Sequence, residues 1–256
     1  MFSWFRDRRR RKLLAEPFPI RWDAILRHNV WHYPRLSAAE QAKLRDITRI
    51  LVAEKEWEGC KGLWVNEEMK VTIAAQAALL ILNLDHDYYA RVPSIVLYPD
   101  SFRTPVAEDG WEDDELSDTV LSGQAVYRGP VILSWHEVLE EGRDPTMGAN
   151  VVIHEFAHQL DFQDNCVNGT PPLDDPVLAA RWAPVMTEAY DRHKASVNRG
   201  RETFFTEHAA DSESEFFANA AEVFFCLPVE LEEEEPEVFA MLAGYFRQDP
   251  RHWFRG

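Results

Sequence analysis

Two histidines and a glutamate lie close together in the segment VVIHEFAHQLD, residues 151–161. On a helix, positions i and i+4 share a face about one turn apart, so His154 and His158 can direct imidazole nitrogens toward one ion. Zinc binds imidazole nitrogen well, and a catalytic zinc site keeps a position open for water. Glu155 can take the proton of that water while the metal polarises a scissile carbonyl. The segment predicts a Zn²⁺ site of the HExxH peptidase type.

The alternative is an amphipathic helix that carries two histidines by chance. The residues around the motif are mostly apolar, which predicts a helix buried over much of its circumference. Histidines and a glutamate are costly to bury unless a partner satisfies them, and a metal ion does so; this favours the zinc site. Asp161, on the same face, is predicted either to hold a ligand histidine by its second nitrogen or to anchor the helix end or the following loop.

Two histidines leave zinc without a third protein ligand. Positions 159–168 read QLDFQDNCVN, so no third histidine follows at short spacing. The ligand is therefore expected from another helix, and the segment SESEFFANAAEVFF offers Glu215 and Glu222 on one face. Glu215 also has capping-box spacing from Ser212, so its alternative role is to close a helix start, and the alternative role of Glu222 is to support a ligand histidine. Spacing leaves the choice between the two glutamates open.

The elements that must position these residues follow from periodicity and turn signals. The predicted fold class is α+β: a single domain with a mixed sheet and the HExxH segment on a helix. An acidic loop, EDGWEDDE, is expected at 108–115 between strands. Helices are predicted at 36–57, with Ser37 and Glu40 in capping-box spacing, at 69–84, from about 147, at 176–197 and from Ser212 to Pro228; strands are predicted at 93–99, 120–129 and 129–135.

Composition limits the function classes. A formal net charge of −17 makes direct nucleic-acid binding unfavourable. The apolar run at 71–84 is shorter than a membrane span, so no transmembrane segment is predicted. Cys60, Cys166 and Cys226 are too few and too scattered for a disulfide framework, and they lack CxxC spacing. Free thiols are typical of a reducing compartment, so we expect a cytoplasmic protein.

Residues 1–19 are predicted to be a flexible, basic N-terminal tail, and residues 20–256 a zinc metallopeptidase domain. The cluster from Arg6 to Lys12 has no apolar stretch behind it, so it is not a secretory signal. A second interpretation of the tail is peripheral contact with a membrane surface or an acidic partner, because Phe2, Trp4 and Phe5 stand beside the basic residues.

The sequence also resembles a known family, the Mlc titration factor A peptidases, which are distantly similar to the catalytic domain of anthrax lethal factor. The resemblance covers about residues 20–250 and rests on VLYP, GWEDDE, VLSGQAVYRGPVILSW, NVVIHEFAHQLD and SEFFANAAEVFF, in the family's order. It implies a cytoplasmic, zincin-like zinc metallopeptidase, which could be of aminopeptidase type, acting on a peptide or protein substrate. It implies His154 and His158 as zinc ligands, Glu155 as general base, and Glu215 as third ligand in preference to Glu222.

One position departs from the family pattern. Seven residues before the ligand glutamate the family usually has a tyrosine thought to support the tetrahedral intermediate, and this chain has His208. A histidine can also donate to a developing oxyanion, so we assign His208 a catalytic role. In the alternative, His208 ligates zinc and the reaction at the site is slowed or inhibited. The family's proline two residues before that glutamate is replaced by Glu213.

Two further expectations concern partners. In zinc peptidases an edge strand beside the motif helix pairs with the extended substrate. Either GPVILSW or LSGQAVY is a candidate for this edge strand. The alternative is that the segment forms an interior strand with no role in substrate binding. The resemblance also implies binding of a glucose-responsive, Mlc-like transcriptional repressor, since the founding member of the family binds one. The rival function is therefore a non-catalytic, repressor-binding regulatory protein with a structural or vestigial metal.

Overall fold

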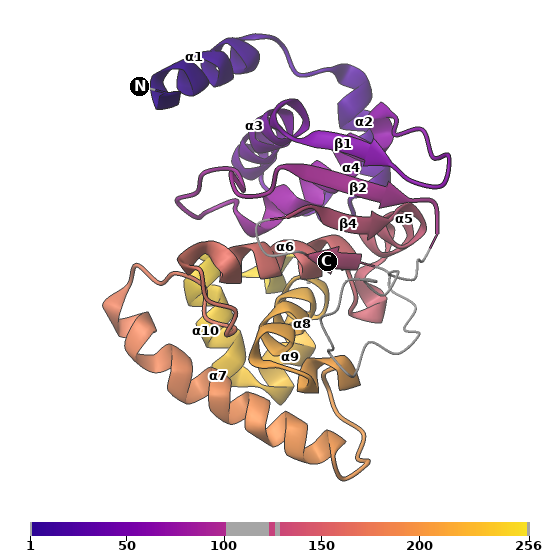
Figure 1. Cartoon of the computed structure of the whole chain (residues 1–256). Coiled ribbons are helices and arrows are strands. Elements are labelled where there is room, and N and C mark those ends of the chain that lie inside the picture. The colour runs from indigo at the N-terminus through magenta and orange to yellow at the C-terminus, as the bar shows by residue number, and fades with distance from the viewer. Residues whose placement is uncertain (1, 101–122, 126–128, 255–256) are drawn as a thin grey trace, which may run out of the picture.

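A computed structural model describes residues 2–100, 123–125 and 129–254 (Figure 1). The chain is mostly helical with one small sheet, which confirms the predicted α+β class. The acidic loop at 108–115 and most of the strand at 120–129 lie outside the described residues.

The helices are α1 (Phe2–Ala15), α2 (Ile20–Asn29), α3 (Ala38–Glu54), α4 (Glu67–Leu80), α5 (Trp135–Arg143), α6 (Val151–Asp161), α7 (Pro176–Val197), α8 (Glu213–Cys226), α9 (Pro228–Glu234) and α10 (Pro236–Phe246). The strands are β1 (Glu56–Gly59), β2 (Ser94–Tyr98), β3 (Gly123–Ala125) and β4 (Val131–Ser134).

The sheet is mixed, as predicted, with strand order β1-β2-β4-β3. β1, β2 and β4 are parallel, and β3 runs antiparallel to β4. Because β4 is paired on both sides, the suggestion that GPVILSW forms the substrate-binding edge is wrong. Within the described strands β3 takes the end position. Figure 1 shows α6 crossing below the sheet, between it and the helices α7 to α10.

The helix α4 accounts for the long apolar run of the sequence. Asn66 caps it by accepting a hydrogen bond from the amide of Met69 at 3.0 Å. Every residue from Val71 to Leu80 is buried, and the helix packs against α3, α2 and α6. An all-round apolar helix is a core helix, and it forms the support on which α6 rests.

The capping box predicted at the start of α3 is present. The Ser37 hydroxyl accepts from the amide of Glu40 at 3.3 Å, and the Glu40 carboxylate accepts from the amide of Ser37 at 2.8 Å. Two amides that the helix itself cannot satisfy are thereby paired, which fixes where α3 begins.

The N-terminal segment differs from the expected flexible tail, because Phe2–Ala15 forms the helix α1. Arg10 makes two hydrogen bonds to the Glu54 carboxylate, at 2.7 and 2.6 Å. Arg49 donates to the carbonyls of Leu13 and Leu14 at the C-terminal end of α1. These partners lie 35 to 44 residues away in the sequence, so local composition did not reveal them.

Several elements were not predicted, among them α2, α9, α10, β1 and α5. The helix predicted at 36–57 ends at Glu54, and its last residues belong to β1, of which only Trp57 is partly covered. α5 starts directly after β4, within the run that was assigned entirely to a strand. No helix within the described residues combines the length and apolar character that crossing a membrane requires.

Candidate metal centre

The helices α6 and α8 bring the chemically active side chains together. Asn150 caps α6 by accepting from the amide of Ile153 at 3.0 Å, and Ser212 caps α8 by accepting from the amide of Glu215 at 3.1 Å. Both helices are buried along most of their length, and they pack directly against each other. Rigid, capped helices hold side chains more firmly than loops do.

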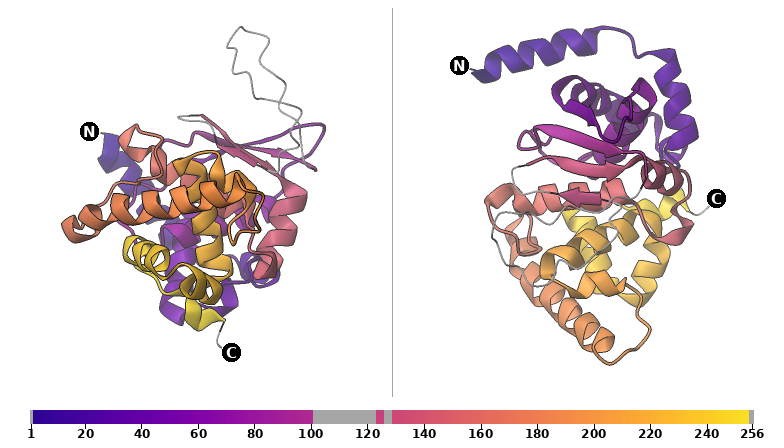
Figure 2. Two further views of the ribbon diagram at one scale, coloured as in Figure 1. Left: turned by 90° about the horizontal axis from the view of Figure 1, so that it is seen from below. Right: turned by 45° about the vertical axis from the view of Figure 1, so that its right-hand side comes forward.

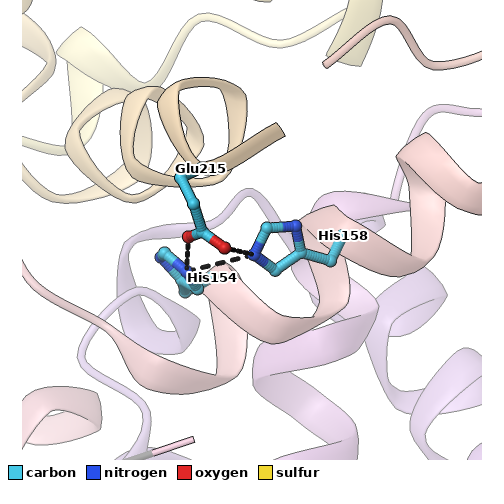
Figure 3. Close-up of side chains that lie close together, drawn as sticks. All are labelled: His154, His158 and Glu215. Carbon is cyan, nitrogen blue, oxygen red and sulfur yellow. Dashed lines mark hydrogen bonds and ion pairs between the residues drawn. The ribbon is translucent and has the colours of Figure 1, made fainter. Parts of the chain in front are cut away.

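Three side chains from these helices converge on one point (Figure 3). His154 Nε2 lies 3.1 Å from Glu215 Oε2, and His158 Nε2 lies 3.3 Å from Glu215 Oε1. The two Nε2 atoms are 3.2 Å apart, and the three potential ligand atoms all lie within 4.8 Å of one another. The side chains are 15%, 8% and 23% exposed respectively, so the cluster is largely covered but reachable from solvent.

The outer nitrogens of the two imidazoles are already engaged. His154 Nδ1 lies 3.0 Å from Glu222 Oε2, and His158 Nδ1 lies 3.1 Å from Ser214 Oγ. Ser214 donates its single hydroxyl proton to Asp161 at 2.7 Å, so it accepts from His158. With protons on both Nδ1 atoms, both neutral imidazoles turn Nε2 lone pairs toward the Glu215 carboxylate. Lone pairs facing one another repel, so this donor set fits a cation such as Zn²⁺ between them.

Glu222 is held in place by several donors. Its Oε1 accepts from the amide of Asn150 at 2.9 Å, and its Oε2 accepts from the side-chain amide of Asn219 at 2.9 Å. The residue is buried, and a buried carboxylate is tolerated only with such partners. Glu222 therefore orients the His154 ring from behind and does not reach the point where the three ligand atoms meet.

The electrostatics of the cluster favour a positive charge at its centre. Burial opposes a charge on His154, yet the carboxylates of Glu222 and Glu215 raise its pKa well above the ordinary value. Burial also acts to raise the pKa of Glu215, but hydrogen bonds from His154, His158 and His208 hold it far below its usual range. A bound cation would supply the same stabilisation as a proton on His154.

Glu155 lies beside the cluster on α6 and is only 4% exposed. Burial raises its pKa to about 8, although the positive charge of His154 opposes the shift. A cation held by the neighbouring residues would lower the pKa again, because opposite charges stabilise the ionised form. The carboxyl group is thus next to the point where the ligand atoms converge, in a poorly solvated setting.

His208 approaches from the short 3₁₀ turn before α8 and is 60% exposed. Its Nε2 lies 3.1 Å from Glu215 Oε2, its Nδ1 lies 2.6 Å from Asp211 Oδ2, and its ring stacks over that of His154 at 6.2 Å. The hydrogen bond to Glu215 raises the pKa of His208 to about 9. The side chain can therefore present an N–H at the solvent side of the cluster.

The structure brings together all seven residues singled out in the sequence. Of the two glutamates, Glu215 meets both histidine Nε2 atoms, whereas Glu222 contacts the outer nitrogen of His154. Glu215 uses only its backbone amide in the Ser212 cap, so its carboxylate remains available to the cluster. Asp161 accepts from the amides of Gly169 and Thr170, which anchors the loop after α6, and it contacts His158 only indirectly, through the Ser214 hydroxyl.

Sequence reasoning missed the polar residues that hold the cluster from outside, namely Ser214, Asn150 and Asn219. Asn150 gave a usable signal, because an asparagine just before an apolar helix is a favoured cap. The contacts of Ser214 to His158 and Asp161 cross between helices more than fifty residues apart in the sequence, and nothing local indicates them. Asn219 contacts Thr206 and Glu222, only 13 and 3 residues away, but its spacing from Glu222 does not by itself indicate a role.

Comparison with known proteins identifies the family. Residues 4–247 match the model of the glucose-regulated metallo-peptidase M90 family. An uncharacterised protein of Synechocystis is 33% identical over 95% of this chain and 90% of its own length. Mlc titration factor A of Edwardsiella ictaluri is 31% identical over 82% of this chain and 81% of its own length, and that of Yersinia enterocolitica is 30% identical over 84% and 81%.

The chain therefore belongs to the M90 family of metallopeptidases. Its relatives within that family include the Mlc titration factors A, as the resemblance in the sequence predicted.

Proposed function

We propose that the chain is a zinc-dependent peptidase whose ligands are His154, His158 and Glu215. The observation that carries this proposal is the convergence of two imidazole Nε2 atoms and one carboxylate within 4.8 Å, each imidazole being held from behind. When bound there, zinc supplies Lewis acidity, which activates water and polarises a peptide carbonyl. Membership of a metallopeptidase family supports the same chemistry.

The residues around the ligands have separate tasks in this proposal. Glu155 accepts a proton from the attacking water and later passes it to the leaving amine. His208 donates an N–H to the oxygen of the attacked carbonyl as negative charge develops on it. Glu222 and the Ser214–Asp161 pair keep the two imidazole rings in one orientation and one tautomer.

The substrate side of the proposal rests on the sheet. β3 occupies the end position within the described sheet and lies against α6, the helix that carries Glu155. An extended peptide can add to such a strand through main-chain hydrogen bonds, which would place its carbonyl next to the metal ligands. We assign residues 20–256 to a single zincin-like peptidase domain, because buried side chains from α2 to the C-terminal turn share one apolar cluster. The three free cysteines support a cytoplasmic location.

The test is hydrolysis of fluorogenic peptides by the zinc-loaded wild type and Glu155→Gln, with Glu230→Gln on the exposed side of α9 as the matched control. The substrate set contains each peptide with a free and with an acetylated N-terminus, so that it separates aminopeptidase from endopeptidase action. We expect Glu155→Gln to lose about 10²- to 10⁴-fold in kcat while it retains zinc. A zinc-loaded Glu155→Gln that cleaves as fast as Glu230→Gln would contradict the mechanism.

A second function is supported by the relatives named Mlc titration factor A. We propose that the chain also binds an Mlc-like repressor, and that this binding does not require proton transfer by Glu155. Purified Mlc of Yersinia enterocolitica is then expected to bind the wild type and Glu155→Gln equally. If Mlc binds but no peptide in the set is cleaved by the zinc-loaded wild type, the non-catalytic regulatory function is the better account.

A further inference from the structure

The helix α1 is fixed to the rest of the chain by one of its faces. Arg10 pairs with Glu54 on α3, and its guanidinium lies 4.2 Å from the centre of the Tyr88 ring. Arg6 pairs with Asp87 at 2.8 Å. Together with the contacts of Arg49 to the C-terminal end of the helix, these interactions fix which side of α1 faces outward.

The outward side carries aromatic and basic residues together. Trp4 and Phe5 are 53% and 60% exposed, although both are large apolar side chains. At 100° per residue, the exposed positions 4, 5, 8, 9, 11, 12 and 15 fall on one continuous arc of the helix, with the exposed Asp7 at its margin. Positions 6, 10, 13 and 14 fall on the opposite side and are partly buried. The aromatic and basic residues of this outward arc, which we call the basic–aromatic face, are Trp4, Phe5, Arg8, Arg9, Arg11 and Lys12.

The cations of the basic–aromatic face are available to a partner. Within the described residues, none of its four basic side chains forms an ion pair with a carboxylate, in contrast to Arg6 and Arg10 on the docked side. Arg8 lies over the Trp4 ring at 5.6 Å, and Arg9 and Arg11 reach only backbone carbonyls, those of Ala53 and Asp7. The face therefore combines unneutralised charge with exposed aromatic surface.

The charge of the face is opposite to that of the whole chain. The helix contains six basic residues and one acidic residue, whereas the chain has a formal net charge of −17. An extended anionic surface would therefore attract only this end of the molecule and repel the rest. Figure 1 and the right-hand view of Figure 2 both place α1 at the end of the molecule opposite α7.

We propose that the basic–aromatic face of α1 docks the chain on a bilayer that contains anionic phospholipids. A cluster of four to eight arginine and lysine residues on a surface helix is typical of segments that bind anionic lipid, and tryptophan is enriched at the level of the headgroups. The cations meet lipid phosphates, and the two aromatic rings enter the boundary between headgroups and acyl chains. A nucleic acid would satisfy the cations but would offer Trp4 and Phe5 no apolar phase. This proposal does not depend on the peptidase function.

The test is co-sedimentation of the full chain with vesicles of phosphatidylcholine alone, or of equal parts phosphatidylcholine and phosphatidylglycerol, at low and high salt. Arg8→Glu/Arg11→Glu is compared with Arg199→Glu/Arg201→Glu, which removes the same charge from exposed positions after α7. Each basic residue near an anionic surface contributes roughly fivefold in affinity, so we expect the α1 pair to lose at least about 30-fold. Trp4→Ser should weaken binding several-fold, whereas Trp64→Ser, at a position 87% exposed, should not.

The expected pattern is binding to anionic vesicles only, weakened by salt and by the α1 variants, with the control variants unchanged. Circular dichroism and the melting temperature should be the same for all four variants, because the substituted side chains are exposed. Equal binding to neutral vesicles, full binding by the α1 double variant, or an equal loss in the Arg199/Arg201 control would overturn the proposal. So would binding of an oligonucleotide through Arg8 and Arg11 with no binding of vesicles.

Discussion

The two faces of α8 show how one buried helix serves both stability and chemistry. Toward α6 it presents Ser214, Glu215, Asn219 and Glu222, each paired across the interface or within the polar network. Away from α6 it presents aromatic rings, among them Phe224, which contacts the rings of α10. The apolar face fixes the helix in place, so that the polar face can hold two carboxylates in a poorly solvated position. Substitutions on the two faces should therefore change different properties.

Two of the histidines that contact α8, His32 and His154, differ in the charge that their surroundings favour. His32 Nε2 lies 2.9 Å from the carbonyl of Phe225 with no carboxylate beside it, and burial lowers its pKa to about 4. His154 is largely covered, with 15% of its side chain exposed, but the carboxylates of Glu222 and Glu215 raise its pKa. Burial alone thus keeps a histidine neutral, whereas burial with two carboxylates creates a position for a cation.

The largest expected effect lies on the apolar face. Replacing Phe224 by alanine leaves a cavity among the rings of Phe239 and Phe246, and should lower the free energy of unfolding by about 3–5 kcal/mol. Urea unfolding of the metal-free chain measures the loss, with Phe5→Ala at an exposed position as the control. The zinc affinity of the folded fraction should not change. A matching loss of zinc affinity would mean that the two faces are not separate.

The second prediction uses pH. The pKa of His32 is near 6.5 in the unfolded chain and about 4 in the folded one, so the unfolded chain binds the extra proton between these values. The contribution of neutral His32 to the free energy of unfolding is therefore fully present above about pH 6.5. It decreases as the pH falls toward 4, by roughly 3 kcal/mol at most.

His32→Gln keeps a donor for the Phe225 carbonyl and removes the titration. Urea unfolding at several pH values between 6.5 and 4.5 should show a smaller loss of stability for His32→Gln than for the wild type. Parallel losses in the two proteins would contradict the assignment of a neutral, buried His32.

The third prediction concerns the polar face. Glu222→Gln keeps the shape of the side chain but removes the negative charge behind His154, and should weaken zinc binding by about 10- to 100-fold. Competition with a chromophoric chelator measures the affinity, and Glu230→Gln is the control. The metal-free variant should also lose about 1–3 kcal/mol of stability, because both Glu222 oxygens accept hydrogen bonds and the glutamine NH2 leaves a buried donor without an acceptor. An unchanged affinity would show that Glu222 does not support the ligand.

The smallest expected effect is at the start of α8. Ser212→Ala removes the cap that accepts from the amide of Glu215 and should cost about 1 kcal/mol of stability. Thermal unfolding measures it, and Ser196→Ala is the control, because this half-buried hydroxyl near the end of α7 donates only to a carbonyl of its own helix. A loss of several kcal/mol would mean that the cap also fixes the position of the Glu215 carboxylate.

Residue spacing predicted the parts of the centre that lie within one turn of a helix. His154, Glu155 and His158 follow from a single pattern, and the start of α8 at Ser212 follows from its capping signal. The third ligand did not follow from spacing, since Glu215 and Glu222 share a face of α8; only resemblance to a family favoured Glu215. The docked α1 and the support from Ser214 depend on contacts between distant segments, which no local pattern contains.

The most direct measurement is anomalous scattering at the zinc absorption edge from crystals of the zinc-loaded chain. We predict one strong peak bounded by His154 Nε2, His158 Nε2 and the Glu215 carboxylate, with Glu222 contacting only the outer nitrogen of His154. A peak at Glu222, or none between α6 and α8 in a chain that retains zinc, would contradict the assignment of this cluster as the metal centre.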